Sequence, residues 1–266
     1  MNWIEALFLG IVQGLTEFLP VSSSGHLEIG NHILGLKNAG ESNLTFTLVV
    51  HAATVLSTLT VFYKDIFSIT KGLFKFENNE ETQFVTNIII SMIPVAIVGL
   101  FFKDQVEALF TNDIIFVGFA LLLTASLLIM SQLMKKTNKE INPLRAFVIG
   151  LSQALAVIPG LSRSGATIAT GLLLGVKRER MARFSFLMVI VPVLGESFLE
   201  LLKGDLSAEV SGIPIHVLIV GFLGAYLSGL FACKAMINLV SKAKLHYFAI
   251  YCIVVGLSVI ILNGFF

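Results

Sequence analysis

Long apolar stretches recur along the chain and constrain its fold more than any other feature. Each is roughly 19 to 21 residues long, which is enough for an α-helix to cross a hydrocarbon core of about 30 Å. We therefore expect six membrane-spanning helices. Their approximate positions are 44–63, 84–102, 114–134, 184–202, 215–233 and 247–265.

The composition agrees with a chain that uses lipid as its solvent. Only 13% of the residues are charged and 56% are apolar, whereas a soluble domain carries roughly 25% charged residues. The net charge of +1 gives no support to a nucleic-acid partner. Cys233 and Cys252 both lie in apolar segments and form no zinc or redox spacing. These features predict an all-α integral membrane protein and exclude a soluble enzyme or a disulfide scaffold.

Two further apolar regions are interrupted by polar residues. Residues 3–36 predict a helix of about 17 residues, a break at 20–25 (PVSSSG) and a second helix of about ten. Residues 145–176 repeat this pattern, with a break at 159–165 (PGLSRSG). Non-helical backbone at membrane depth is tolerated only where it is buried in protein or lines a cavity. We therefore expect both regions to be re-entrant helical hairpins.

The two hairpin regions are related at a constant offset of 140 residues. Aligning 6–26 with 146–166 gives seven identities in 21 ungapped positions. Three spans separate the hairpins, so the hairpins should enter the membrane from opposite faces. We therefore expect an inverted-topology repeat, 1–139 and 140–266, each half consisting of one re-entrant hairpin and three transmembrane helices. The identities include three residues of the break, Ser22/Ser162, Ser24/Ser164 and Gly25/Gly165.

The basic residues are distributed unequally between the two faces of this topology. Three of the 18 lie on the side of the first hairpin, and Arg163 lies in the second break. By the positive-inside rule, the richer side is cytoplasmic, so the first hairpin should open to the outside. The remaining 14 lie on the side of the second hairpin: Lys64, Lys71, Lys75, Lys135, Lys136, Lys139, Arg145, Lys177, Arg178, Arg180, Arg183, Lys234, Lys242 and Lys244.

Polar side chains cluster at the two breaks, although polar groups inside a membrane are costly to bury. Each break is followed by the N-terminus of a short helix, where free N–H groups and the helix dipole favour an anion. Arg163 can bind phosphate oxygens bidentately. A serine beside a histidine and a carboxylate supplies a nucleophile, a base and an orienting group. The sequence therefore predicts a membrane-embedded phosphate site with hydrolytic residues.

The segments QGLTEFLPVSSSGH (13–26) and PGLSRSGAT (159–167) resemble the paired signatures of the undecaprenyl-diphosphatase family. Its members are bacterial membrane enzymes associated with bacitracin resistance, and the resemblance covers essentially the whole chain. It implies hydrolysis of undecaprenyl diphosphate to the monophosphate and inorganic phosphate, which recycles the lipid carrier of cell-wall synthesis. It also implies a bacterial cytoplasmic membrane, with the active site open to the extracytoplasmic side.

The resemblance also implies roles for individual residues. Mg²⁺ or Ca²⁺ dependence is a family expectation, with Glu17 as the residue that would bind the ion. The chain departs from many members at Gln13, where they have a glutamate. The catalytic positions fall on Glu17, Ser23, His26 and Arg163. The substrate-binding positions fall on Gln13, Ser22, Ser24, Gly25, Ser162, Ser164 and Thr167.

We expect Ser23 to attack the terminal phosphorus while His26, oriented by Glu17, takes its proton. Direct attack by His26 is the alternative chemistry. The expected partners are a polyprenyl diphosphate and membrane lipids, and a homodimer is left open. Broken helices in inverted repeats are also typical of transporters. A secondary transporter or a flippase of a phosphorylated lipid is therefore the alternative function.

Three further polar residues lie within the predicted spans. His51 is interpreted as a helix-packing residue, with support of the phosphate site as the alternative. Glu196 and Glu200 are four residues apart, so they share one helix face. For this pair we expect a structural or interfacial role, with lining of the cavity as the alternative.

Overall fold

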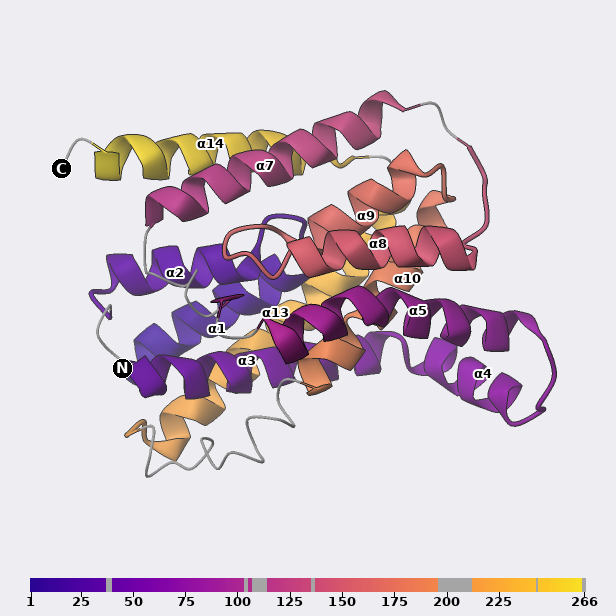
Figure 1. The fold of residues 1–266 in the computed structure, drawn as a ribbon. Coiled ribbons are helices and arrows are strands. Elements are labelled where there is room, and N and C mark those ends of the chain that lie inside the picture. Colours follow the sequence, from indigo (N-terminus) through magenta and orange to yellow (C-terminus); the bar gives the residue numbers. More distant parts are fainter. Residues whose placement is uncertain are drawn as a thin grey trace.

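The computed structural model is a bundle of helices (Figure 1). It describes residues 1–36, 40–102, 105–106, 114–134, 137–195, 212–242 and 244–264, without the side chains of 40–44, 241 and 264. This part of the chain contains no β-strand, only an isolated bridge between Lys139 and Val176. The helices, in chain order, are α1 (Trp3–Phe18), α2 (Ser23–Ile33), α3 (Gly40–Val61), α4 (Tyr63–Leu73), α5 (Glu80–Phe101), α7 (Ile114–Leu133), α8 (Pro143–Leu155), α9 (Arg163–Leu173), α10 (Arg178–Met188), α13 (Ile215–Ser241) and α14 (His246–Gly264).

The long helices confirm an all-helical, multi-pass membrane protein. Among the described residues, α5, α7, α13 and α14 are long and apolar enough to cross a membrane. The first predicted span corresponds to α3, which together with α4 forms a fifth candidate bent by 73°. The span predicted at 184–202 begins inside α10, but its residues from 196 onward, including Glu196 and Glu200, lie outside the described residues.

A further helix follows the first predicted span. Residues 64–73 carry charged side chains and form most of α4, whose first turn contains Asp65 and whose last turn contains Lys71. Acidic groups near the N-terminus of a helix and basic groups near its C-terminus complement the helix dipole. The same charges that mark the end of the apolar span therefore stabilise a further helix.

Both interrupted regions form a pair of short helices joined at the predicted break. In the first region α1 has 16 residues and α2 has 11. In the second region α8 has 13 residues and α9 has 11. Asparagine caps the first helix of each pair: the Asn2 side chain accepts from the N–H of Glu5, and the Asn142 side chain accepts from that of Arg145. The two caps are 140 residues apart, as are the repeated sequences.

Each short-helix pair packs against a long helix from the other half of the sequence. Helix α1 packs against α13, and α8 packs against α5. Glycine permits the close approach in both places, because a Cβ on Gly10 would meet the backbone oxygen of Gly221 and one on Gly150 would meet that of Ser91. Helices α7 and α14, each the last long helix of its half, pack against each other (Figure 1).

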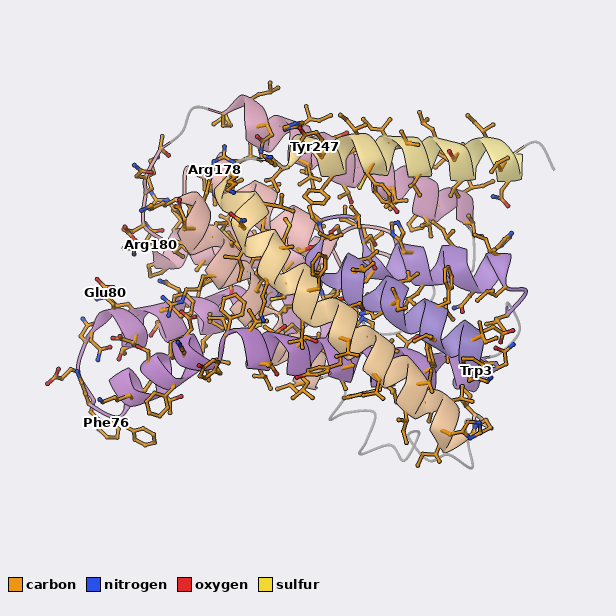
Figure 2. The ribbon with its side chains drawn as sticks, turned by 180° about the vertical axis from the view of Figure 1, so that it is seen from behind. Trp3, Phe76, Glu80, Arg178, Arg180 and Tyr247 are labelled. Atoms are coloured by element: carbon orange, nitrogen blue, oxygen red, sulfur yellow. The ribbon has the colours of Figure 1, made fainter. Side chains whose placement is uncertain are left out.

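Charged side chains gather at one end of the molecule. Figure 2 shows Glu80, Arg178 and Arg180 at this end and Trp3 at the other. Two ion pairs connect α10 to neighbouring segments here, Arg180 with Glu140 and Arg183 with Asp65 at 2.7 Å. This end therefore carries the basic residues 177–183, which the sequence assigned to the cytoplasmic side.

Candidate active site at the two breaks

The first break ends in a strained serine that caps α2. Ser22 has φ 71° and ψ 102°, a left-handed conformation that is unfavourable for a residue with a side chain. Its Oγ accepts from the N–H of Gly25 at 3.2 Å and lies 3.2 Å from the hydroxyl of Ser24. The hydroxyl of Ser22 thus satisfies one free N–H of the helix terminus. The backbone conformation of Ser22 sets the direction in which α2 leaves the break.

The second break has the same cap in an unstrained form. Ser162 Oγ accepts from the N–H of Gly165 at 3.1 Å and lies 3.3 Å from the hydroxyl of Ser164. Its own N–H donates to the hydroxyl of Thr124 on α7 at 3.1 Å, which ties the break to a long helix. Both short helices therefore begin with a serine cap, at equivalent positions of the repeated sequence.

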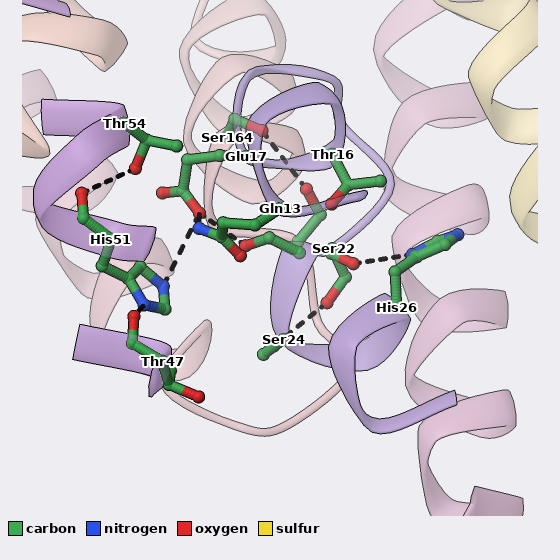
Figure 3. Close-up of polar contacts among 12 residues, drawn as sticks. Gln13, Thr16, Glu17, Ser22, Ser24, His26, Thr47, His51, Thr54 and Ser164 are labelled. Carbon is green, nitrogen blue, oxygen red and sulfur yellow. Dashed lines mark hydrogen bonds and ion pairs between the residues drawn. The ribbon is translucent and has the colours of Figure 1, made fainter. Parts of the chain in front are cut away.

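The two breaks touch each other. The hydroxyl of Ser164 donates to the carbonyl oxygen of Leu19 at 3.2 Å. A Cβ on Gly25 would lie 3.0 Å from Cα of Gly160, so the backbones approach at a glycine on each side. Figure 3 shows Ser164 beside the turn that follows α1. The structure therefore brings together the polar residues that the sequence placed in two separate motifs.

A single carboxylate oxygen collects the donors of the first hairpin. Glu17 Oε2 accepts from the Ser23 hydroxyl at 2.5 Å and from Gln13 Nε2 at 3.0 Å. Nε2 of His51, on α3, lies 3.8 Å from the same oxygen (Figure 3). The guanidinium of Arg163 also attracts this carboxylate. A buried carboxylate is stable only when it is paired and hydrogen-bonded, and these four groups fulfil that requirement.

His26 lies away from this carboxylate. Its Nδ1 is 2.7 Å from the carbonyl oxygen of Ser22, and its Nε2 is 2.8 Å from the hydroxyl of Tyr251 on α14. The rings of His26 and Tyr251 are also stacked, with centroids 5.6 Å apart. Among the described contacts, the Ser23 hydroxyl donates to Glu17, and His26 contacts neither of these two residues. The expected chain from Ser23 through His26 to Glu17 is not the arrangement of this structure.

Thr167 is buried, and its hydroxyl is hydrogen-bonded within the protein. Its hydroxyl lies 2.7 Å from that of Ser185 on α10 and donates to the carbonyl oxygen of Arg163 at 2.9 Å. Its exposed fraction is 1%. The structure therefore gives Thr167 a packing contact behind the second break, which holds the first turn of α9 in place.

The residues around Glu17 fit a hard divalent cation only in part. Oε1 of Gln13 is buried and has no hydrogen-bond partner in the described part of the chain. This amide oxygen and the Glu17 carboxylate are both ligands that Mg²⁺ and Ca²⁺ prefer. No group of three or more His, Cys, Asp or Glu residues that could bind a metal occurs among the described residues. The protein groups therefore fit an ion bound mainly by water and by phosphate oxygens of a ligand.

Three contacts of the site were not predicted from the sequence. They involve Tyr251 on α14, Thr124 on α7 and Ser185 on α10, each of which lies outside the hairpin that it contacts. A hydroxyl inside an apolar helix was the only available signal. This signal is weak, because serine and threonine in membrane helices usually bond within their own helix or pack against a neighbouring one.

Comparison with known proteins identifies the family. The family model described as bacitracin resistance protein BacA matches residues 6–258. A Bacteroides thetaiotaomicron protein named undecaprenyl-diphosphatase is 59% identical over 263 residues, covering 98% of this chain and 99% of its own length. A protein of the same name from Parabacteroides distasonis is 59% identical, over 98% of each chain. Another, from Halothermothrix orenii, is 38% identical over the full length of both chains. None of these names supports a transporter. The chain belongs to the bacitracin resistance protein BacA family.

Proposed function

We propose that this protein hydrolyses undecaprenyl diphosphate to undecaprenyl phosphate and inorganic phosphate. This reaction would recycle the lipid carrier of bacterial cell-wall synthesis and give resistance to bacitracin. The observation that carries the proposal is the Ser23 hydroxyl, which donates to Glu17 at 2.5 Å beside the Arg163 motif. Relatives that match the chain over nearly its whole length carry the name of this activity.

Binding of the diphosphate falls to Arg163 and to the N-termini of α2 and α9. Arg163 is the first residue of α9, so its side chain and the free N–H groups of that helix belong to the same turn. A guanidinium and a helix N-terminus are both favourable partners for phosphate oxygens. The hydroxyls of Ser22, Ser24, Ser162 and Ser164, together with Gly25, shape these termini, and Thr167 supports them from behind.

In the first chemical step, Ser23 Oγ attacks the terminal phosphorus and the bond to the bridging oxygen breaks. Glu17 Oε2 takes the hydroxyl proton, because that hydrogen already points at this oxygen. Undecaprenyl phosphate leaves with the bridging oxygen. This assignment gives Glu17 the role of base that the sequence analysis gave to His26, and the contacts of the two residues support the change.

In the second step, water attacks the phosphoserine and Ser23 leaves, taking back the proton from Glu17. His26 is the base that we assign to this water. Its Nδ1 faces the carbonyl oxygen of Ser22 and therefore carries a hydrogen, which leaves Nε2 as the basic atom of the neutral ring. Release of Nε2 from the Tyr251 hydroxyl would make this atom available.

A divalent cation would be bound by the carboxylate of Glu17 and the free amide oxygen of Gln13. An ion there supplies positive charge that stabilises the phosphate oxygens in the transition state. With one carboxylate from the protein, water and phosphate oxygens would complete the coordination, which is the usual situation for Mg²⁺.

The architecture that we propose for the membrane is an inverted repeat of 1–139 and 140–266. Equivalent caps at Asn2 and Asn142 support it, as does the exchange of packing partners between the halves. The basic end of the molecule would face the cytoplasm of the bacterial inner membrane. The first hairpin would then open to the extracytoplasmic side.

The test is phosphate release from undecaprenyl diphosphate or farnesyl diphosphate by the detergent-purified protein in the presence of Mg²⁺. We expect Ser23→Ala and Arg163→Ala each to lower kcat/KM by about 10² or more. Matched controls are Ser126→Ala on the exposed face of α7 and Arg145→Ala at the start of α8, both of which should retain activity. No release by the wild type, or full release by the Ser23 and Arg163 variants, would reject the proposed function.

A further inference from the structure

His51 is a polar residue at the site for which the proposed reaction has no role. It lies on α3, and its Nε2 is 3.8 Å from Glu17 Oε2, the oxygen that accepts the Ser23 hydrogen. The side chain of His51 is 15% exposed and that of Glu17 is 8% exposed. Figure 3 shows the imidazole directed from α3 toward the Glu17 carboxylate. A largely buried ring on another helix therefore meets the base of the first step.

The partners of the ring define where its hydrogens lie. Nδ1 is 2.8 Å from the carbonyl oxygen of Thr47, which can only accept, so Nδ1 carries a hydrogen. Nε2 faces a carboxylate oxygen, and a bare nitrogen lone pair in that direction would be repelled. The N–H of Nδ1 is therefore directed at the helix of His51 itself, and Nε2 is the ring atom directed at Glu17.

The contact with Glu17 matters because both other donors to that oxygen come from the first hairpin. Gln13 is on the same helix as Glu17, and Ser23 begins the next helix. His51, in contrast, lies on α3, a long helix outside the hairpin, and contacts the carboxylate from there. At 3.8 Å the attraction is electrostatic, since a hydrogen bond needs a shorter distance. It acts in a buried site, where charges interact more strongly than in water.

We propose that His51 is a positioning residue, which holds Glu17 Oε2 in the orientation that accepts the hydrogen of Ser23. The proposal rests on the proposed function, in which Glu17 is the base. His51 acts through Glu17, and the described contacts include no hydrogen bond or ion pair between His51 and Ser23. If the carboxylate were unrestrained, its rotation could displace Oε2 by about 1 Å. Such a displacement would lower the rate of the first step by an order of magnitude or more, while binding of the diphosphate would be unaffected.

Two conservative variants separate this role from helix packing. In His51→Gln the amide nitrogen lies near the position of Nε2, so a donor still reaches Glu17 while the bond to Thr47 is lost. In His51→Asn the amide nitrogen lies near the position of Nδ1, so the bond to Thr47 is kept and the donor to Glu17 is lost. We expect His51→Asn to lower kcat about tenfold with KM unchanged, and His51→Gln to stay within about threefold of wild type.

The opposite order of the two variants, or equal activity of both, would overturn the proposal. His216→Asn and His216→Gln, at an exposed position in the first turn of α13, are the matched controls and should leave kcat unchanged. A measurement without turnover separates this proposal from the proposed function. A fluorophosphonate probe should label Ser23 at a rate that falls about tenfold in His51→Asn and persists in His51→Gln. If this labelling pattern were found but the wild type released no phosphate, only the proposed diphosphatase activity would be rejected. If phosphate were released but both His51 variants were labelled at the same rate, the positioning role of His51 would be rejected.

Discussion

Gly10→Ala tests whether the contact between α1 and α13 holds the site in place. A Cβ at this position would overlap the backbone oxygen of Gly221 and lie 3.0 and 3.1 Å from its carbonyl carbon and Cα. Backbone atoms cannot rotate away, so the two helices must separate by about 1 Å to restore an ordinary contact of ~3.5 Å. Overpacking of this kind costs about 3 kcal/mol at the upper end of its range. The better helix propensity of alanine returns about 1 kcal/mol, so the net loss is about 2 kcal/mol.

The displacement should reach the active site, because Glu17 lies two turns farther along α1. A shift of about 1 Å in a catalytic group lowers the rate by roughly one to two orders of magnitude. We therefore expect Gly10→Ala to lower the melting temperature by about 5 °C in detergent, and to lower kcat about tenfold or more. Thermal unfolding followed by tryptophan fluorescence would measure the first, since Trp3 is on the same helix. Phosphate release would measure the second.

Gly99→Ala is the matched control, since a Cβ at Gly99 on α5 meets nothing within 4 Å. It gains the helix propensity without the overlap, and should therefore be as stable as the wild type or up to about 1 kcal/mol more stable. Gly150→Ala should resemble Gly10→Ala, because its Cβ would overlap the backbone of Ser91 on α5. If Gly10→Ala were as stable and as active as Gly99→Ala, close packing of α1 on α13 would not position Glu17, and our reasoning would be refuted.

Two other predictions concern the cation and the orientation in the membrane. Gln13→Glu adds a second carboxylate beside Glu17, and should lower the Mg²⁺ concentration needed for half-maximal phosphate release by about tenfold, whereas an unchanged or higher concentration would exclude Gln13 from the cation site. Ser24→Cys should react with a membrane-impermeant maleimide added from the extracytoplasmic side of intact cells. Reaction only in inverted vesicles would reverse the proposed orientation.

The helix breaks could be predicted from the sequence because their determinants are local. A serine followed three residues later by glycine caps α2 and α9 alike, through bonds that span three positions. The cap repeats at the predicted offset, and so do the asparagine caps of α1 and α8. The contacts of such a segment are contained in its own residues, so the sequence is sufficient.

The direction of each side chain within the site could not be predicted, since it depends on helices far away in the sequence. His26 and Ser23 are three residues apart and were expected to act together. Helix α2 instead turns the ring of His26 toward Tyr251 on α14. His51 lies 34 positions after Glu17, in a stretch whose pattern predicts only an apolar span, and no motif connects the two residues. Long-range packing decides both contacts, and a single sequence does not record it.

The burial of Glu17 explains why the structural and the chemical contacts of the site coincide. An ionised carboxylate buried inside a membrane protein needs hydrogen-bond donors or cations around it. Without them, the free-energy cost of removing the charge from water is large. The chain provides the Ser23 hydroxyl, the Gln13 amide, the Arg163 guanidinium and the imidazole of His51. A hydroxyl recruited to stabilise the charge is by the same bond prepared to lose its proton to it. The folding requirement of one buried residue therefore aligns the Ser23 hydroxyl, the nucleophile that we propose, before any substrate binds.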